Sequence, residues 1–395
     1  MLKGKCVVLG VTGSIAAYKI ANLASALVKL GADVNVIMTK NATNFINPIT
    51  FETLTSNKCL VDTFDRDFKF NVEHVALAKR ADIFMVAPAS ANVIGKMAHG
   101  IADDMLTTTI LAAKCKKLVS PAMNTNMFTN PIVQDNLEIL KKYGFEIIQP
   151  ASGYLACGDT GAGKMPEPEV LLQYILREIA FDHDLEGKKV MITAGPTQEA
   201  IDPVRYISNH STGKMGYAIA RAAMLRGAEV TLVSGPVAIQ PPMFVDVVNI
   251  KSAAEMAEAV KSRAGEMDII IKSAAVADYR PATVAAEKIK KKDGEASSIE
   301  LERTEDILSY LGANKKPGQF ICGFSMETEN MLENSKAKLK KKNVDMIVAN
   351  NLRTAGAGFG TDTNVVTLIT AEDAHELPIM SKDDVAQVIL DEIVK

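Results

Sequence analysis

Three side chains in the first half of the sequence could do chemistry on a small substrate. His74 could act as a base near neutral pH, where an imidazole titrates, although a single histidine is more often structural. Cys157 lies in a glycine-rich segment, residues 153–165, where core packing explains a thiol poorly. Such a loop could bring the thiol to a substrate. Asn124 follows a predicted strand and could either hold a polar group or cap a helix.

The segment 10–14, Gly-Val-Thr-Gly-Ser, is typical of a turn that binds phosphate. Glycine lets the backbone approach an anion, and the start of the following helix favours negative charge. The segment matches neither the dinucleotide-binding pattern nor the P-loop, so a plain tight turn explains it equally well. Other hydroxyl and amide side chains suit an uncharged ring system with one phosphate: Thr39, Ser90, Asn92 and Thr107.

Three polar segments of the second half could bind phosphorylated ligands. Residues 205–216 form a polar loop that ends where a helix is predicted to begin, which suits an anion. Residues 272–281 precede a run of lysines, and residues 323–328 precede a helix with two lysines one turn apart. The candidate side chains in and after these segments are Arg205, Asn209, Lys272, Ser273, Ala274, Asp278, Lys288, Phe324, Lys338 and Lys342.

These lysines have three possible explanations. They could form a solvated surface, a nucleic-acid patch, or a site for a triphosphate together with a phosphorylated acid. The formal charge of −3 and the 5% of aromatic residues weaken the nucleic-acid explanation.

A strand–turn–helix–strand pattern that positions the candidate residues occurs twice. In the first half, strands are predicted at 5–10 and 32–39, with a helix between them that ends at Gly31. In the second half, the pattern is a strand at 188–194, a helix at 215–226 and a strand at 228–234. We therefore predict an α/β protein with two Rossmann-like domains that meet near residues 182–187.

In open parallel sheets, ligands bind beyond the carboxyl ends of the strands. We therefore expect two groups of loops, each around its own ligand. The first group is 10–14, 39–44, 87–93 and 120–127, and the second is 194–214, 272–281, 322–328 and 349–354.

Length and composition agree with a soluble globular protein of two domains. The chain has 395 residues, of which 48% are hydrophobic and 23% charged. Five scattered cysteines form no C-x-x-C pair, and their odd number excludes a complete disulfide framework, which favours the cytoplasm. The start of the chain lacks a signal-peptide pattern, and no apolar stretch is long enough for a membrane helix.

Four separated motifs in the first half resemble the homo-oligomeric flavin-containing cysteine decarboxylases, which have a flavodoxin-like fold. They are His74, the stretch 88–92 (Pro-Ala-Ser-Ala-Asn), Pro121-x-Met123-Asn124-x-x-Met127, and the 156–165 clamp with Cys157, Lys164 and Met165. The second half resembles phosphopantothenate–cysteine ligase. The chain is therefore similar, over nearly its whole length, to the bacterial bifunctional decarboxylase/ligase family of coenzyme A biosynthesis, with domains at 1–186 and 187–395.

For the first half, the resemblance implies an FMN-dependent decarboxylase of 4′-phosphopantothenoylcysteine. The flavin would oxidise the cysteinyl group to a thioaldehyde, CO₂ would leave, and the resulting enethiol would be reduced to 4′-phosphopantetheine. His74 would be the base, Asn124 would hold the substrate carboxylate, and Cys157 would donate a proton. FMN would contact Gly13, Ser14, Thr39, Ser90, Asn92, Thr107 and Ala122, and the clamp residues Lys164 and Met165 would bind substrate.

For the second half, the resemblance implies that CTP and 4′-phosphopantothenate form an acyl-cytidylate, which cysteine then attacks. Lys288 would support the first step, and Asn209 and Arg205 would belong to the loop that closes over the intermediate. The nucleotide would contact Lys272, Ser273, Ala274, Asp278, Glu305, Asp306, Ile307, Leu308, Phe324, Lys338 and Lys342. Mg²⁺ is expected because nucleotidyl transfer needs its phosphate charge neutralised, but no all-protein metal site stands out, so the metal ligands stay unknown.

The sequence departs from the family pattern at several positions. Lys164 stands where arginine is usual in the family. Lysine keeps the positive charge but lacks the planar guanidinium group, so the substitution affects substrate binding rather than the chemical steps. Phe128 and Val93 stand where Trp and Thr are common. In the second half, Ser325-Met326 replaces Ala-Ala, and Thr304-Glu305 replaces Asn-Pro.

Three other functions fit the same fold less well. A nicotinamide-dependent dehydrogenase would need the glycine-rich fingerprint and an acidic residue where Thr39-Lys40 stands. A non-catalytic flavoprotein would not need His74, Asn124 and Cys157 together. A flavin prenyltransferase would lack the Cys157 clamp and the second domain. The resemblance also implies small-molecule partners, no nucleic acid or membrane, and a homo-oligomer of trimer-based flavin sites and ligase dimers, often a dodecamer.

Overall fold

The computed structural model describes residues 1–64, 73–154, 158, 160–290, 298–327, 331–351, 358 and 360–395. The chain divides into two compact units, Met1–Phe181 and Asp182–Lys395. Cys157 lies outside the described residues.

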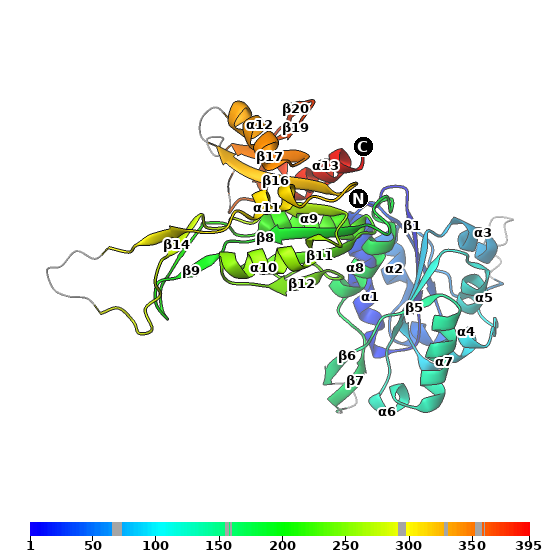
Figure 1. The fold of residues 1–395 in the computed structure, drawn as a ribbon. Coiled ribbons are helices and arrows are strands. Elements are labelled where there is room, and N and C mark those ends of the chain that lie inside the picture. Colours follow the sequence, from blue (N-terminus) through cyan, green and yellow to red (C-terminus); the bar gives the residue numbers. More distant parts are fainter. Residues whose placement is uncertain are drawn as a thin grey trace. The chain divides into compact units, whose positions relative to one another are not determined.

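A five-stranded parallel sheet forms the centre of the first unit, in the order β2-β1-β3-β4-β5 (Figure 1). Its strands are β1 (Cys6–Val11), β2 (Asp33–Met38), β3 (Ile83–Ala89), β4 (Lys116–Pro121) and β5 (Phe145–Ile147). β1 and β3 are buried throughout, as expected for parallel strands that are covered on both faces.

Helices cover both faces of this sheet (Figure 1). One face carries α1 (Lys19–Lys29), α2 (Pro48–Thr55) and α8 (Pro168–Ile179). The other carries α3 (Glu73–Arg80), α4 (Ala91–Ala98), α5 (Met105–Ala112) and α7 (Pro131–Lys142), whose apolar residues pack with the sheet in one core cluster. Short helices η1 (Ile15–Tyr18), η2 (Lys40–Asn44) and α6 (Thr125–Phe128) follow β1, β2 and β4, and β6 (Ala151–Tyr154) pairs with β7 (Thr160–Lys164) as a ribbon.

The second unit contains an eight-stranded sheet in the order β12-β11-β8-β13-β16-β17-β19-β20. The first six of these strands run parallel, and β19 and β20 are antiparallel. Their bounds are β8 (Lys189–Ala194), β11 (Glu229–Ser234), β12 (Asp246–Asn249), β13 (Ile269–Lys272), β16 (Phe320–Glu327), β17 (Met346–Asn351), β19 (Val366–Thr370) and β20 (Ala374–Glu376).

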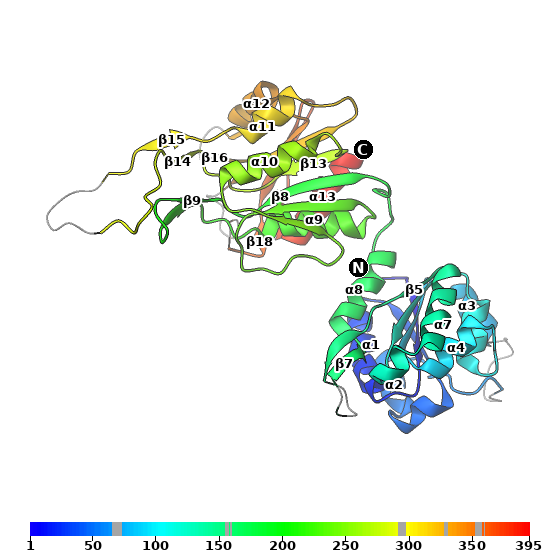
Figure 2. The same ribbon diagram turned by 60° about the horizontal axis from the view of Figure 1, so that its bottom comes forward.

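Two groups of helices sandwich this sheet (Figure 2). α9 (Lys214–Leu225) and α13 (Lys382–Val394) pack together on one face. α10 (Ala253–Ala264), α11 (Ile307–Ala313) and α12 (Met331–Lys342) cover the other and contribute to its apolar core. The prediction of an α/β protein with Rossmann-like parallel sheets is therefore confirmed.

A two-stranded arm extends from the second unit away from its sheet (Figures 1 and 2). β14 (Tyr279–Pro281) pairs antiparallel with β15 (Leu301–Arg303). Beside the arm, β9 (Gln198–Ala200) pairs with β10 (Tyr206–Ser208), so part of the stretch 194–214 that we expected to be loop forms two short strands. A further two-stranded pair joins β18 (Thr363–Asn364) to β21 (Met380–Ser381).

Candidate active sites

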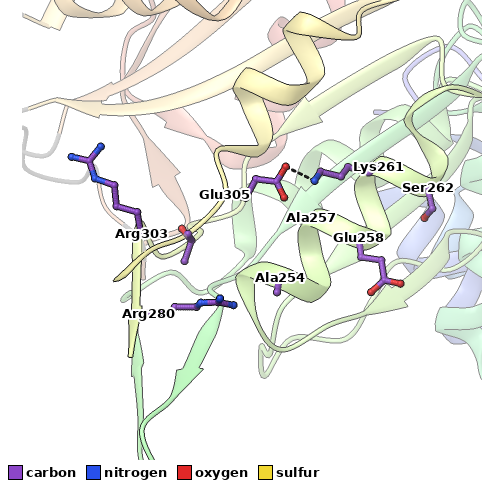
Figure 3. Close-up of a pocket in the computed structure, with 9 residues that line it drawn as sticks. Ala254, Ala257, Glu258, Lys261, Ser262, Arg280, Arg303 and Glu305 are labelled. Carbon is purple, nitrogen blue, oxygen red and sulfur yellow. Dashed lines mark ion pairs between the residues drawn. The ribbon is translucent and has the colours of Figure 1, made fainter. Parts of the chain in front are cut away.

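A cavity of about 820 Å³ is not the site that the sequence predicts, although one predicted residue lines it (Figure 3). It is an open groove between α10 and the start of the arm. Glu305 pairs there with Lys261, and the Lys261 ammonium also lies 4.8 Å from the centre of the Tyr310 ring. The two cavities at the carboxyl ends of the sheets contain more of the predicted residues.

The cavity of the first unit, about 620 Å³, is formed by three of the four loops expected to meet. Gly13 and Ser14 follow β1, Ser90 begins α4, and residues 122–127 follow β4. The expectation is confirmed for these loops, whereas residues 39–44 do not line the cavity. Of the predicted side chains, those that line it are Gly13, Ser14, Ser90, Ala122, Asn124, Lys164 and Met165.

Thr12 holds two of these loops together beneath the cavity. Its fully buried hydroxyl donates to the Pro88 carbonyl at 2.6 Å and accepts from the Ser90 amide at 2.9 Å. These bonds satisfy two backbone groups that would otherwise be costly to bury. Ser90 then caps α4 through its own side chain, which accepts from the Val93 amide.

The clamp strand β7 reaches the cavity because of a glycine. Gly163 has φ +126°, and a Cβ on it would lie 2.3 Å from the Met123 carbonyl oxygen. The Met123 amide donates to the Gly163 carbonyl at 3.1 Å. This close approach brings Lys164 and Met165 beside Asn124, whose side chain accepts from the Asn126 amide at the start of α6.

An ion pair that the sequence analysis missed lines the same cavity. The Lys19 ammonium lies 2.7 Å from the Glu167 carboxylate, and Lys164 lies 3.9 Å from it. The hydrogen bond from Lys19 holds the pKa of Glu167 below its usual value. No local sequence pattern could have paired Lys19 with Glu167, since 148 positions separate these two residues. Tyr18, Met127 and Tyr154 complete this part of the lining.

Four predicted residues of the first unit lie outside the cavity. Thr39 caps η2, and Thr107 is buried in a capping box with Asp104. Asn92 is exposed on α4. His74 is half-buried on α3, a helix that lies with α4 and α5 on one face of the sheet (Figure 1).

The cavity of the second unit, about 360 Å³, is formed by all four of the expected loops. Its lining includes residues 211–216 at the start of α9, residues 272–276 after β13, residues 324–326 of β16 and Asn350 of β17. The predicted residues that line it are Asn209, Lys272, Ser273, Ala274, Asp278, Phe324 and Lys338.

Hydrogen bonds fix the floor of this second cavity. Asn209 donates to the Ala275 carbonyl at 2.9 Å, and Ser273 donates to the Thr193 carbonyl at 2.6 Å. Gly216 lets α9 approach β8 closely, since a Cβ there would lie 2.5 Å from the Ala194 Cβ. Lys272 ends β13, which lies beside β8 in the sheet, and burial lowers the pKa of the Lys272 ammonium to about 8.

Three further polar side chains complete this cavity. The sequence analysis did not find Lys382, and it expected Lys214 and Asn350 only as parts of the loops 194–214 and 349–354. Lys382 is buried and donates to the Gly358 carbonyl, while Lys214 pairs with Asp362 at 2.7 Å. The Oδ1 atom of Asn350 is buried and has no hydrogen-bond partner in the part of the chain that the structure describes. No local pattern marks Lys382, because only the fold brings α13 to this edge of the sheet.

The remaining predicted residues of the second unit lie around this cavity rather than in its lining. Lys342 of α12 pairs with Asp306 and donates to the Ser309 hydroxyl at 2.6 Å. Ile307 and Leu308 are buried in the core, so their side chains cannot face a ligand.

Arg205 and Lys288 lie together near the arm. Arg205 pairs with Asp202 and donates to the Ile289 carbonyl at 3.0 Å, which holds the exposed Lys288 segment in place. The hydrogen bond from Arg205 keeps the pKa of Asp202 well below its usual range.

The described residues contain no group of three or more His, Cys, Asp or Glu side chains that could hold a metal ion. Nor does any described helix combine the length and apolarity needed to cross a membrane.

Fold and sites define an α/β protein with two separate cavities, each at the carboxyl edge of its own parallel sheet. Family models match both halves: a Flavoprotein model covers residues 1–180, and the DNA/pantothenate metabolism flavoprotein C-terminal domain covers 185–395. The chain belongs to the family of the coenzyme A biosynthesis bifunctional proteins CoaBC.

Relatives of that name match along the whole chain. The protein from Bacillus subtilis is 50% identical, with 100% of this chain and 97% of the relative covered. The protein from Escherichia coli is 42% identical, with 100% of this chain and 97% of the relative covered. Among solved structures, the C-terminal domain of a CoaBC protein is 46% identical and covers 54% of this chain and 97% of its own, with a TM-score of 0.46. The FMN binding protein AtHal3 is 32% identical, covers 44% of this chain and 95% of its own, and has a TM-score of 0.39.

Proposed function

We propose that the chain catalyses two successive steps of coenzyme A biosynthesis. The second unit condenses 4′-phosphopantothenate with cysteine through an acyl-cytidylate made from CTP, and the first unit decarboxylates 4′-phosphopantothenoylcysteine to 4′-phosphopantetheine. The observation that carries this proposal is the full-length match to bifunctional relatives, together with one cavity in each unit. We assign the decarboxylase to residues 1–186 and the ligase to residues 187–395.

The cavity of the first unit fits a flavin, and we propose FMN. Its volume of about 620 Å³ lies within the range of cofactor sites. A Cβ on Gly13 would lie 2.9 Å from the Asn41 Cβ, so the turn after β1 can pack this closely against η2 only with glycine at this position. Ala122, Met123 and Met127 provide apolar surface for a ring system. The bound flavin supplies the oxidation that allows CO₂ to leave and the reduction that completes the reaction.

The residues of the first unit have distinct proposed roles in decarboxylation. Asn124 orients the substrate carboxylate through its carboxamide, and Lys164 binds the remainder of the substrate with the cationic side chain that replaces arginine. Cys157 donates a proton to the reduced product, and His74 serves as base. Since His74 does not line the cavity of its own chain, we propose that another copy of the chain supplies it.

In the ligase, we propose that Lys288 neutralises charge on the phosphates during acyl-cytidylate formation. Asn209 and Arg205 then hold the intermediate while cysteine attacks. The nucleotide contacts residues 272–274, Asp278, Phe324 and Lys338 in the cavity. At its border the nucleotide contacts Glu305, Asp306 and Lys342, and the backbone rather than the buried side chains of Ile307 and Leu308. Mg²⁺ accompanies the CTP phosphates and supplies the positive charge that nucleotidyl transfer needs.

We also propose a cytoplasmic homo-oligomer in which trimers complete the flavin sites and dimers join the ligase units, giving a dodecamer. The positions of three proposed site residues support this oligomer. The two cavities of a single chain are not lined by His74, Arg205 or Lys288.

A visible absorption spectrum tests the flavin assignment. We expect the purified protein to be yellow and to release FMN on denaturation. A colourless protein that cannot be reconstituted with FMN would contradict the decarboxylase assignment and leave the ligase assignment intact.

A further inference from the structure

Lys272 is a half-buried amine that lacks a counter-ion of its own. It ends β13 at the carboxyl edge of the sheet and lines the ligase cavity. In the part of the chain that the structure describes, no carboxylate lies within ion-pair distance of its Nζ atom. An ammonium in this position gives up water without gaining a direct partner, which is unfavourable.

The elements around Lys272 contribute charges of both signs. Asp278 follows β13, Asp306 begins α11, and Lys338 and Lys342 face it from α12. The Asp306 carboxylate is already engaged by Lys342 and by the Ser309 amide. Two further cations line the cavity: Lys214 of α9, paired with Asp362, and Lys382 of α13, bonded to backbone carbonyls.

This arrangement disfavours a proton on Lys272 in the empty cavity. Burial lowers the pKa of the Lys272 ammonium from 10.5 to about 8; Lys338 and Lys342 lower it as well, and Asp306 and Asp278 partly oppose the effect. Lys272 in the empty cavity therefore gives up its proton at a lower pH than an exposed lysine does.

We propose that binding of a nucleoside triphosphate in the ligase cavity is coupled to uptake of one proton by Lys272. The amine nitrogen takes the proton from the solvent, and the resulting ammonium donates to the bound phosphates. This inference rests on the proposed ligase function and deepens it, since it makes nucleotide binding depend on pH.

The direction of the pH dependence follows from linkage. Bound phosphate stabilises the ammonium and raises the pKa of Lys272, so the protonated protein binds the nucleotide more tightly. Affinity for CTP should be constant below pH 7 and should fall about tenfold between pH 7 and pH 9. The CTP phosphates do not cause this fall, because a phosphate with a second pKa near 6 is already ionised in that range.

Isothermal titration calorimetry of the full-length protein with MgCTP tests the proposal. Without 4′-phosphopantothenate no turnover occurs. Titrations at pH 8.5 in buffers of different ionisation enthalpy give the number of protons taken up. We expect about 0.7 proton per CTP for the wild type, rising toward one at pH 9.

Two arginine variants identify the group that takes up the proton. Lys272→Arg carries a permanent charge, so its proton uptake and the tenfold loss of affinity should both vanish. Lys340→Arg, on the exposed side of α12, should retain both. Proton uptake near zero in the wild type, or proton uptake that persists in Lys272→Arg, would overturn the inference. In either case, binding of MgCTP would still support the ligase assignment. Absence of any MgCTP binding would contradict both.

Discussion

Single side chains in this protein hold loops from different strands in one place, and Thr12 shows this most simply. Its hydroxyl joins the turn after β1 to the loop after β3 beneath the flavin cavity. The sequence singled out the neighbouring Gly13 and Ser14 as ligand contacts because glycine and serine are typical of phosphate turns. It could not identify Lys19 with Glu167, or Lys382, since such pairs arise only when distant segments fold together.

Replacing Thr12 with valine should loosen the flavin cavity. The change leaves the Pro88 carbonyl and the Ser90 amide buried without partners, at a cost of about 2 kcal/mol. Hydrogen exchange of peptides covering residues 86–94 should accelerate about 30-fold, and FMN should bind more weakly. Thr12→Ser keeps the hydroxyl and serves as the control. Equal exchange in Thr12→Val and wild type would show that these bonds do not support the loops.

At the scale of elements, buried parallel strands were the easiest to predict. The predicted ends of β1, β2, β8 and β11 agree with the structure within a residue or so, because each strand is a largely buried apolar run with a clear stop. A glycine follows β1, β8 and β11 within two residues, and the helix cap Thr39 follows β2. The ribbon β9–β10 and the arm β14–β15 were missed, since three-residue strands have no recognisable periodicity. This matters for function, because the arm carries Lys288 away from the cavity.

The start of α11 provides a pH-dependent test at this scale. Asp306 caps the helix by accepting from the Ser309 amide and pairs with Lys342. Burial raises the pKa of Asp306. Two hydrogen bonds, one from the Lys342 ammonium and one from the Ser309 amide, outweigh this effect and hold the pKa below its usual value of 3.8. The carboxylate therefore adds stability above the unfolded pKa of about 4, and this stability is lost as the pH falls through the folded value.

Asp306→Ala should accordingly destabilise the second unit by about 1–2 kcal/mol at pH 7. The difference from wild type should hold between pH 7 and pH 5 and shrink below pH 4. Thermal unfolding of the ligand-free protein measures it. Asp306→Asn, which keeps a capping oxygen without the charge, should lose less stability at pH 7. A difference that is independent of pH down to pH 3 would refute the role of the ionised carboxylate.

At the scale of the whole molecule, two units with separate cores and separate cavities imply two independent chemistries. The order of motifs along the sequence predicted this division. Sequence could not show that each cavity lacks some of its proposed residues within one chain, because that depends on where α3 and the arm lie.

Lys288→Gln should separate the two activities. The variant loses the ammonium that would offset phosphate charge, so acyl-cytidylate formation should fall at least 100-fold. Decarboxylation of supplied 4′-phosphopantothenoylcysteine should proceed at the wild-type rate. The two rates are measured on the same folded, FMN-loaded preparation. Loss of both activities without unfolding would rule out independent sites.

The most direct test of the central claim is a single reaction of the wild-type protein with 4′-phosphopantothenate, cysteine and MgCTP. Mass spectrometry of the products and measurement of CO₂ follow both steps at once. We expect 4′-phosphopantetheine, with one CMP and one CO₂ released for each molecule formed. Consumption of CTP without CO₂, or no product containing cysteine-derived sulfur, would contradict the assignment of both steps to this chain.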